Sequence, residues 1–314
     1  MPSPSSIFSF DRRNPVLPVV IFATLVVVME AAFSFLPDND VVQRLHASGL
    51  PSTAPDWQIM GDSVAKSGIV ETQLSDCLDH KLVFNAAISG TGPDFPYFTL
   101  KRELDAGVAP KAIVYAPSPH TFASRRVALL VGGYCTWPEV GDVFATRAES
   151  TETLYGVLCK LSYTLRNREK IGGLFKASVA DEVQEEYGGK IKNAPHCPLT
   201  VAQVLPQLRK PFSVLKFNGL MLDKFLQLAG DNHIPVYWTT MPVPPAVHES
   251  REPYAFDENY QAFLADMHDR YGVTVVLKDF PVYDNQSFRD SLHMNHQAAE
   301  RFSQFLGDKL ANLK

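Results

Sequence analysis

The stretch WQIMGDS, residues 57–63, is a short apolar run that ends in a glycine, an acid and a serine. Further apolar runs follow at residues 82–84, 112–116, 234–239 and 273–277. Each run is continuously apolar rather than alternating, which is typical of strands covered on both faces by helices. The sequence therefore predicts five buried strands.

Segments with helix-compatible spacing separate these runs, at residues 95–106, 212–232, 256–271 and 296–313. Alternating strands and helices favour a parallel sheet. We therefore predict an α/β fold, a three-layer α/β/α sandwich with a mostly parallel, flavodoxin-like sheet. In such sheets ligands bind at the carboxyl ends of the strands, where Ser63, Asn85 and Pro117 follow their runs.

Residues 120–205 interrupt the alternation, and they are too many for a simple connection. We predict that they form an inserted, partly helical subdomain, a lid or a substrate groove beside the active face. Residues 38–56 are polar and proline-containing and predict a linker. The predicted catalytic domain is then 57–314, with the insertion inside it.

Residues 15–37 are almost wholly apolar, and Arg12 and Arg13 precede them. A run of this length predicts a transmembrane helix, and the preceding arginines predict a cytoplasmic N-terminus. Residues 1–37 would thus form a cytoplasmic tip and a single inner-membrane anchor, with the rest on the periplasmic or extracellular side. A cleaved signal peptide is the alternative, but no small-x-small cleavage site follows the run.

Glu30 lies inside this apolar run. The first interpretation places its charge near the outer headgroups, where water hydrates it. The second pairs it with a partner membrane protein. We favour the first.

The composition is ordinary for a globular protein, with 314 residues, 46% of them hydrophobic, and a net charge of −5. This mild acidity does not favour nucleic acid as a partner. The cysteines are widely spread and contain no Cys-x-x-Cys pair, which argues against a structural zinc site. An exported location would permit disulfides, but the sequence does not pair Cys77, Cys135, Cys159 and Cys197.

Ser63 and the C-terminal Asp290-Ser291-Leu292-His293 supply a nucleophile, a base and a carboxylate that orients the base. Taken alone, Ser63 is also a good helix N-cap, and Asp290 suits a helix N-terminus. His293 and His296 with Asp290 would be the start of a metal site, but no third or fourth ligand is evident. We predict no metal and no cofactor.

Three segments, IMGDS (59–63), FNAAISGTG (84–92) and DSLHMNHQAA (290–299), resemble the first, second and fifth sequence blocks of the SGNH (GDSL-type) hydrolases. The resemblance covers the framework of residues 57–314 outside the insertion. It implies Ser63 as nucleophile, His293 as general base and Asp290 as its orienting acid. It also implies an oxyanion hole that contains the backbone N–H groups of Ser63 and Gly90.

The third block departs from the family. Pro117-Ser118-Pro119-His120 stands where the family usually shows Gly-x-Asn-Asp, so the asparagine donor is missing. Ser118 or His120 would take its place, or the hole has two donors only. The layout of one N-terminal helix and an exported domain resembles the D-alanyl transfer proteins of teichoic acid and the alginate O-acetylation proteins. That layout implies a membrane-bound O-acyltransferase as partner.

We predict that the protein is a membrane-anchored serine acyl-enzyme that transfers or removes an O-acyl group, with acetyl as the favoured group. The substrate would be an envelope or exported polysaccharide. One alternative is a plain periplasmic esterase or lipase. The other is a non-catalytic scaffold that partners the membrane-bound acyltransferase.

Overall fold

The computed structural model describes residues 16–35, 38, 43, 49–168, 171 and 209–313. Five strands form one sheet in the order β2-β1-β3-β4-β5, and every pairing in it is parallel. The strands are β1 Trp57–Gly61, β2 Val83–Asn85, β3 Ile113–Ala116, β4 Val236–Thr239 and β5 Thr274–Leu277. All five predicted strands and the parallel α/β sheet are therefore confirmed.

Successive residues of β3 pack on opposite faces of the sheet, because side chains of a strand alternate. Ile113 and Tyr115 belong to one buried cluster, and Val114 and Ala116 belong to another. All four side chains are fully buried. This is why the run AIVYA is continuously apolar.

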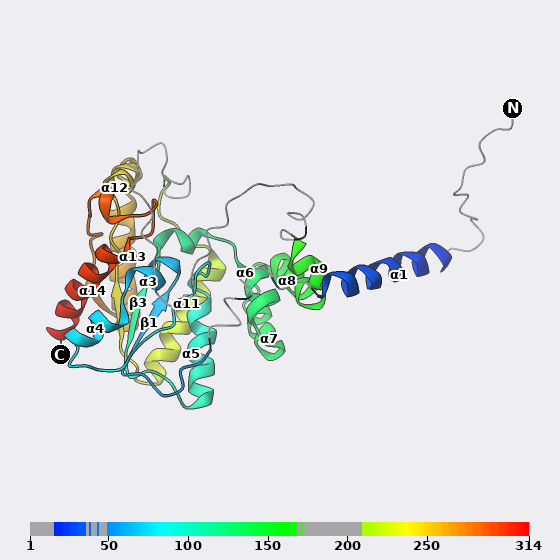
Figure 1. Ribbon diagram of the computed structural model, residues 1–314, viewed down its shortest axis with the longest axis horizontal. Coiled ribbons are helices and arrows are strands. Elements are labelled where there is room, and N and C mark those ends of the chain that lie inside the picture. Colours follow the sequence, from blue (N-terminus) through cyan, green and yellow to red (C-terminus); the bar gives the residue numbers. More distant parts are fainter. Residues whose placement is uncertain are drawn as a thin grey trace.

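Helices cover both faces of the sheet (Figure 1). The helices on the first face are α5 Phe95–Ala106, α11 Lys216–Asp231, α12 Pro245–Arg251 and α13 Phe256–Tyr271. Those on the second are α3 Ser63–Gly68, α4 Glu71–Cys77 and α14 His296–Ala311. The helices predicted from spacing are present, with α11 and α14 shorter than predicted.

Residues 242–245, with the sequence PVPP, follow β4. Val243 forms an isolated parallel bridge with Val282, and Pro244 and Pro245 begin α12. Proline fits the first turn of a helix because the N–H that it lacks has no intrahelical acceptor there.

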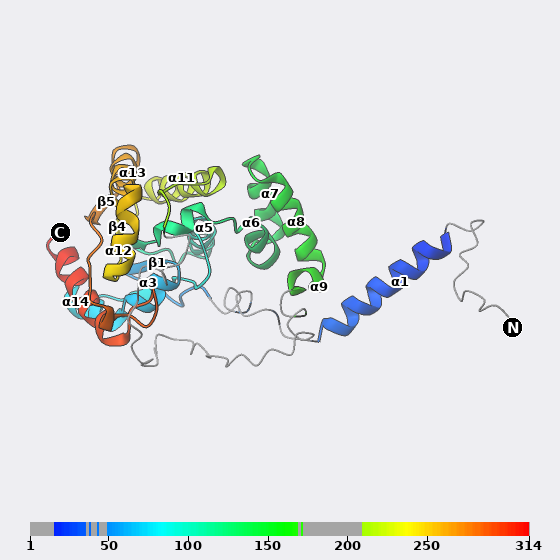
Figure 2. The ribbon, with the colours of Figure 1, turned by 90° about the horizontal axis from the view of Figure 1, so that it is seen from above.

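The described part of the predicted insertion is helical, as expected (Figure 2). It contains η1 Pro119–Ala123, α6 Val127–Leu129, η2 Leu130–Tyr134, α7 Trp137–Ala145, α8 Ser150–Leu161 and α9 Tyr163–Arg166. Residues 169–170 and 172–208, with Cys197, lie outside the described residues. Residues 39–42 and 44–48 of the predicted linker do so as well.

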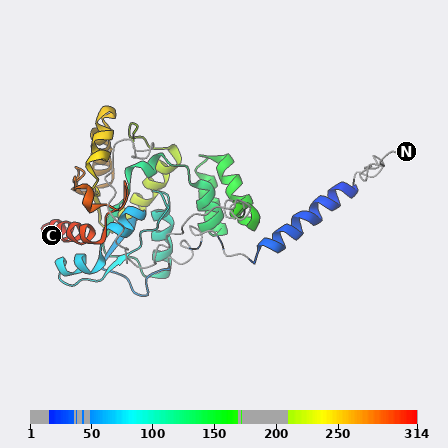
Figure 3. The same ribbon diagram turned by 45° about the horizontal axis from the view of Figure 1, so that its top comes forward.

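Helix α1, Val16–Phe33, occupies most of the predicted anchor and extends away from α9 (Figure 3). Over the described ranges, no helix meets the length and apolarity required to cross a membrane. Glu30 of α1 accepts hydrogen bonds from the Ser162 hydroxyl and from the Thr164 N–H at 3.2 Å. Its partners are thus in α9 and the residue before it, which neither interpretation of the sequence anticipated.

Candidate active site

Ser63 is the first residue of α3, directly after β1. A Cβ atom on Gly61 would lie 2.5 Å from the carbonyl oxygen of Ala116, so only glycine allows β1 to approach β3 this closely. Asp62 is the N-cap of α3, and its Oδ1 accepts from the Val64 N–H at 2.9 Å. Asp62 therefore caps the helix, and the Ser63 hydroxyl is free of that role.

The structure brings the two distant segments together. Ser63 Oγ lies 2.8 Å from His293 Nε2, across 230 residues of sequence. His293 Nδ1 lies 2.8 Å from Asp290 Oδ2 and 3.0 Å from Oδ1. Serine, imidazole and carboxylate are linked in the order that acyl transfer through a serine requires.

Asp290 is fixed by its own turn. Its Oδ1 also accepts from the backbone N–H groups of Leu292 at 2.7 Å and His293 at 2.8 Å. Burial raises the pKa of Asp290, but the hydrogen bonds and charge of His293 outweigh burial and leave the pKa below its ordinary value. Asp290 is thus ionised at neutral pH, and its charge favours the tautomer of His293 with the proton on Nδ1.

Gly90 lies in a tight turn next to the end of β1. Thr91 donates its N–H to the carbonyl of Ile88 at 3.3 Å, and Gly90 has a φ of +82° in between. A positive φ at the third position is typical of a type II turn and favours glycine. Ile88 in turn donates its N–H to the Gly61 carbonyl at 3.1 Å, which ties the turn to β1.

Asn85 anchors the start of the same loop. Its side-chain amide donates to the carbonyl oxygens of Ile69 at 3.2 Å and Lys66 at 3.4 Å. Its Oδ1 accepts from the Ala87 N–H at 3.1 Å. Asn85 is therefore a structural residue of the second block.

Ser118 does not take the place of the missing asparagine. Its hydroxyl donates to Asp62 Oδ1 and its N–H donates to Asp62 Oδ2, each at 3.0 Å. Ser118 is buried, and both of its donors serve Asp62. Of the alternatives that the sequence left open for the third donor, Ser118 is therefore disfavoured, because Asp62 accepts from both of its donors.

His120 lies in η1, within electrostatic range of His293 and Asp62. Burial lowers the pKa of His120 to about 4; the Asp62 carboxylate opposes the shift, and Arg251 and Arg126 reinforce it. The imidazole is therefore neutral at pH 7. Its Nδ1 atom is buried without a hydrogen-bond partner among the described residues.

Two residues close to the Gly90 turn were not identified from the sequence. Arg126, in the loop before α6, donates from Nη1 to the carbonyl oxygen of Gly90. Asp94, the N-cap position of α5, is 1% exposed, and both carboxylate oxygens lack a partner among the described residues. Burial raises the pKa of Asp94 to about 7 although the charge of Arg126 opposes the shift. No local pattern marks either residue, since the surroundings of each are formed only in the fold.

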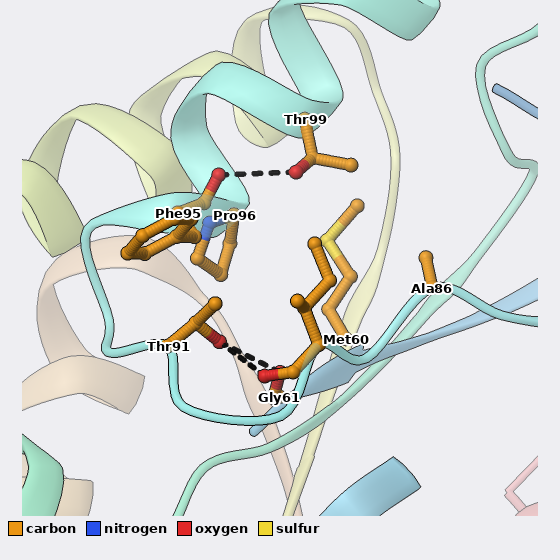
Figure 4. A pocket seen from close by; sticks show the side chains of 8 residues that line it. Met60, Gly61, Ala86, Thr91, Phe95, Pro96 and Thr99 are labelled. Atoms are coloured by element: carbon orange, nitrogen blue, oxygen red, sulfur yellow. Dashed lines mark hydrogen bonds between the residues drawn. The ribbon is translucent and has the colours of Figure 1, made fainter. Parts of the chain in front are cut away.

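A small pocket lies beside the Gly90 turn, between the end of β1 and the first turns of α5 (Figure 4). Thr91 closes one side, with its hydroxyl donating to the Ile88 carbonyl at 2.7 Å. The pocket is lined mainly by apolar side chains: Met60, Gly61, Ala86, Ile88, Thr91, Phe95, Pro96 and Thr99.

The alternative metal site is not assembled. His293 is engaged by Ser63 and Asp290, while His296 Nε2 lies 3.2 Å from Glu300 Oε1. Within the part of the chain that the structure describes, no cluster of three or more metal-ligating side chains occurs. Cys77, Cys135 and Cys159 are free thiols.

No protein-family model and no curated protein matches the chain. Among solved structures, one described as "a putative platelet activating factor from Streptococcus pneumonia" is similar, with 11% sequence identity and a TM-score of 0.39. The alignment covers 96% of this chain and 99% of that one. At this TM-score the likeness assigns neither a family nor a function.

Proposed function

We propose that the protein is an SGNH-type serine acyl-enzyme in which Ser63 is the nucleophile, His293 the general base and Asp290 the orienting acid. The supporting observation is the continuous hydrogen-bonded chain from Ser63 Oγ through both nitrogens of His293 to Asp290. A helix cap or a metal site would not need the serine and the imidazole in contact.

In the first step, Ser63 Oγ attacks the carbonyl carbon of an ester as its proton passes to His293 Nε2. The carbonyl π electrons move to the oxygen, which becomes an oxyanion. When the intermediate collapses, the bond to the leaving alkoxide breaks, and His293 returns the proton to that oxygen. Asp290 stabilises the imidazolium in between and stays ionised.

The proposed oxyanion hole contains the N–H groups of Ser63 and Gly90, with His120 as the third donor. The Val64 N–H is taken by Asp62, whereas the Ser63 N–H has no acceptor within the described ranges. A neutral His120 donates one hydrogen bond without the cost of burying a charge. Each such donor contributes roughly 3–4 kcal/mol to stabilising the transition state.

In the second step, a hydroxyl attacks the acyl-serine with His293 again acting as base. We propose that this hydroxyl belongs to an envelope or exported polysaccharide, or that the first step removes acetyl from such a polymer. Water as acceptor would make the protein a plain esterase.

The proposal includes membrane attachment through residues 1–37 and action beside a membrane-bound O-acyltransferase. The apolar run and the arginines that precede it support attachment. The layout of the chain supports the partner. A non-catalytic scaffold remains the alternative that an inert Ser63 would favour.

The test is acetylation with a chromogenic acetyl ester. We expect acetyl on Ser63 by peptide mass spectrometry, no acetyl on a Ser63→Ala variant, and faster release of acetyl when an oligosaccharide acceptor is added. Release that is unchanged by acceptors would support the esterase. A folded protein with no acetyl-serine would refute the proposed chemistry.

A further inference from the structure

Helices α8 and α9 carry an apolar face that no other described segment of the chain covers. Every third or fourth position from residue 154 to 165 is a leucine exposed to solvent: Leu154 56%, Leu158 45%, Leu161 68% and Leu165 37%. Within α8, spacings of four and three place Leu154, Leu158 and Leu161 in one row along the helix, and Leu165 follows in α9, beyond the extended residue Ser162. We call this row the leucine stripe.

The opposite side of α8 is fixed against the insertion. Gly156 lies so close to η2 that an added Cβ would be 2.6 Å from the Cβ of Val131. Gly132 of η2 is equally close to α8, 2.9 Å from the Cβ of Cys159. The stripe thus faces away from η2 and α6, which lie between α8 and the sheet in Figures 1 and 2. Burying the leucine stripe by moving α8 would break this close packing between α8 and η2.

Helix α1, which contacts α9, is also apolar and exposed. Four consecutive residues of α1, Val19, Val20, Ile21 and Phe22, are 45–69% exposed. Consecutive helical residues are about 100° apart, so these four surround the helix. A helix that is apolar on every side needs a surrounding apolar solvent or core, not one partner surface.

Polar contacts join α1 to α9 as one unit. Glu30 accepts hydrogen bonds from Ser162 and Thr164, at the start of α9. Asp38, beyond the end of α1, accepts from Arg166 Nε and from Asn167 Nδ2, each at 2.9 Å. The leucine stripe is therefore held next to the end of α1.

We infer that the leucine stripe binds the surface of a lipid bilayer together with α1, so that the insertion is a membrane-contact module and not only a lid. A bilayer fits better than a protein partner, because a bilayer can surround α1 on every side and also contact the neighbouring leucine stripe. This inference rests on the proposed membrane attachment. It would hold the active site at a fixed height above the membrane, where an acyl donor from a membrane protein would arrive.

The experiment places a tryptophan reporter in the stripe of the full chain, as Leu158→Trp, with Leu161→Trp as a second position. The control is Leu313→Trp, which has matched exposure (47% against 45%) and lies at the end of the molecule far from α1 in Figure 1. Each protein is reconstituted with phosphatidylcholine vesicles brominated in the upper acyl chain. The signal of the three native tryptophans is subtracted with the unsubstituted protein.

We expect bromine to quench the stripe reporters at least twofold more than the control. Equal quenching while the protein floats with the vesicles would overturn the inference and favour a protein partner for the stripe. A protein that does not float would overturn both lipid contact and attachment. Acetylation of Ser63 in the same samples reports separately on the proposed chemistry.

Discussion

Replacing Ser118 by alanine separates its two candidate roles. The hydroxyl of Ser118 donates to Asp62 Oδ1 at 3.0 Å, and the substitution removes this bond. The backbone N–H of Ser118, 3.0 Å from Oδ2, and the N–H of Val64 still hold the carboxylate. The turn that carries Ser63 should therefore keep its shape.

The expected magnitudes follow from burial and charge. A hydrogen bond to a charged group contributes roughly 1.5–3 kcal/mol, and water cannot easily replace a partner that is 4% exposed. We expect Ser118→Ala to lower the free energy of unfolding by about 2 kcal/mol. Loss of an oxyanion donor would instead slow the reaction by roughly 10²–10³-fold. We expect that loss for His120→Ala, and less than about threefold for Ser118→Ala.

The assay combines urea unfolding, followed by circular dichroism, with the second-order rate of fluorophosphonate labelling at Ser63. Phosphonylation develops negative charge on the same oxygen position as acyl transfer, so it reports on the oxyanion donors. Hundredfold slower labelling of Ser118→Ala with unchanged unfolding would refute the assignment of Ser118 to Asp62. Labelling of His120→Ala at the normal rate would refute His120 as the third donor.

Three further predictions concern the loops around Ser63. Gly61→Ala should lower the free energy of unfolding by about 3 kcal/mol or prevent folding, because the added Cβ would lie 2.5 Å from the carbonyl oxygen of Ala116. The control is Gly141→Ala in α7, where no atom lies within 4 Å of the added Cβ; it should be neutral or stabilising in the same urea titration. A Gly61→Ala protein as stable as Gly141→Ala would contradict the packing. In the folded protein the pKa of Asp94 is about 7, against an ordinary value of 3.8. Between about pH 4 and 7 the folded state therefore binds a proton that the unfolded state has lost, and the free energy of unfolding should fall as the pH rises through this range. Asp94→Asn should remove most of this pH-dependent loss of stability, which is on the order of a few kcal/mol. If the free energies of unfolding of the two proteins changed with pH in the same way, the raised pKa of Asp94 would be contradicted. Arg126→Ala should slow fluorophosphonate labelling by roughly tenfold, because it frees the Gly90 carbonyl. Arg126→Lys should restore part of the rate, and neither substitution should change the free energy of unfolding to a matching extent. Labelling of the alanine variant at the full rate would show that Arg126 is not a positioning residue.

The sheet was predictable because its signal is local. A run such as AIVYA at 112–116 is apolar at every position, and that property alone indicates a strand buried on both faces. The order of the strands and the register of their pairing cannot be predicted from such local patterns, because they depend on contacts between distant segments. The α12 helix was missed because its first turn is built from prolines, which also begin loops.

The candidate triad was predictable because each of its residues lies within a short motif. The sequence could not choose between Ser118 and His120, because the donors of Ser118 are engaged by Asp62, 56 residues away in sequence. Arg126 and Asp94 carry no motif, and the contact between Glu30 and Ser162 spans 132 residues. Such contacts depend on tertiary structure that periodicity and spacing do not encode.

The central claim is that His293 activates Ser63, and fluorophosphonate labelling followed by peptide mass spectrometry tests it most directly. The full chain should carry its adduct on Ser63, and labelling of a folded His293→Ala variant should be slower by roughly 10³-fold or more. A folded native protein without an adduct on Ser63, or a His293→Ala variant labelled at the native rate, would contradict the account.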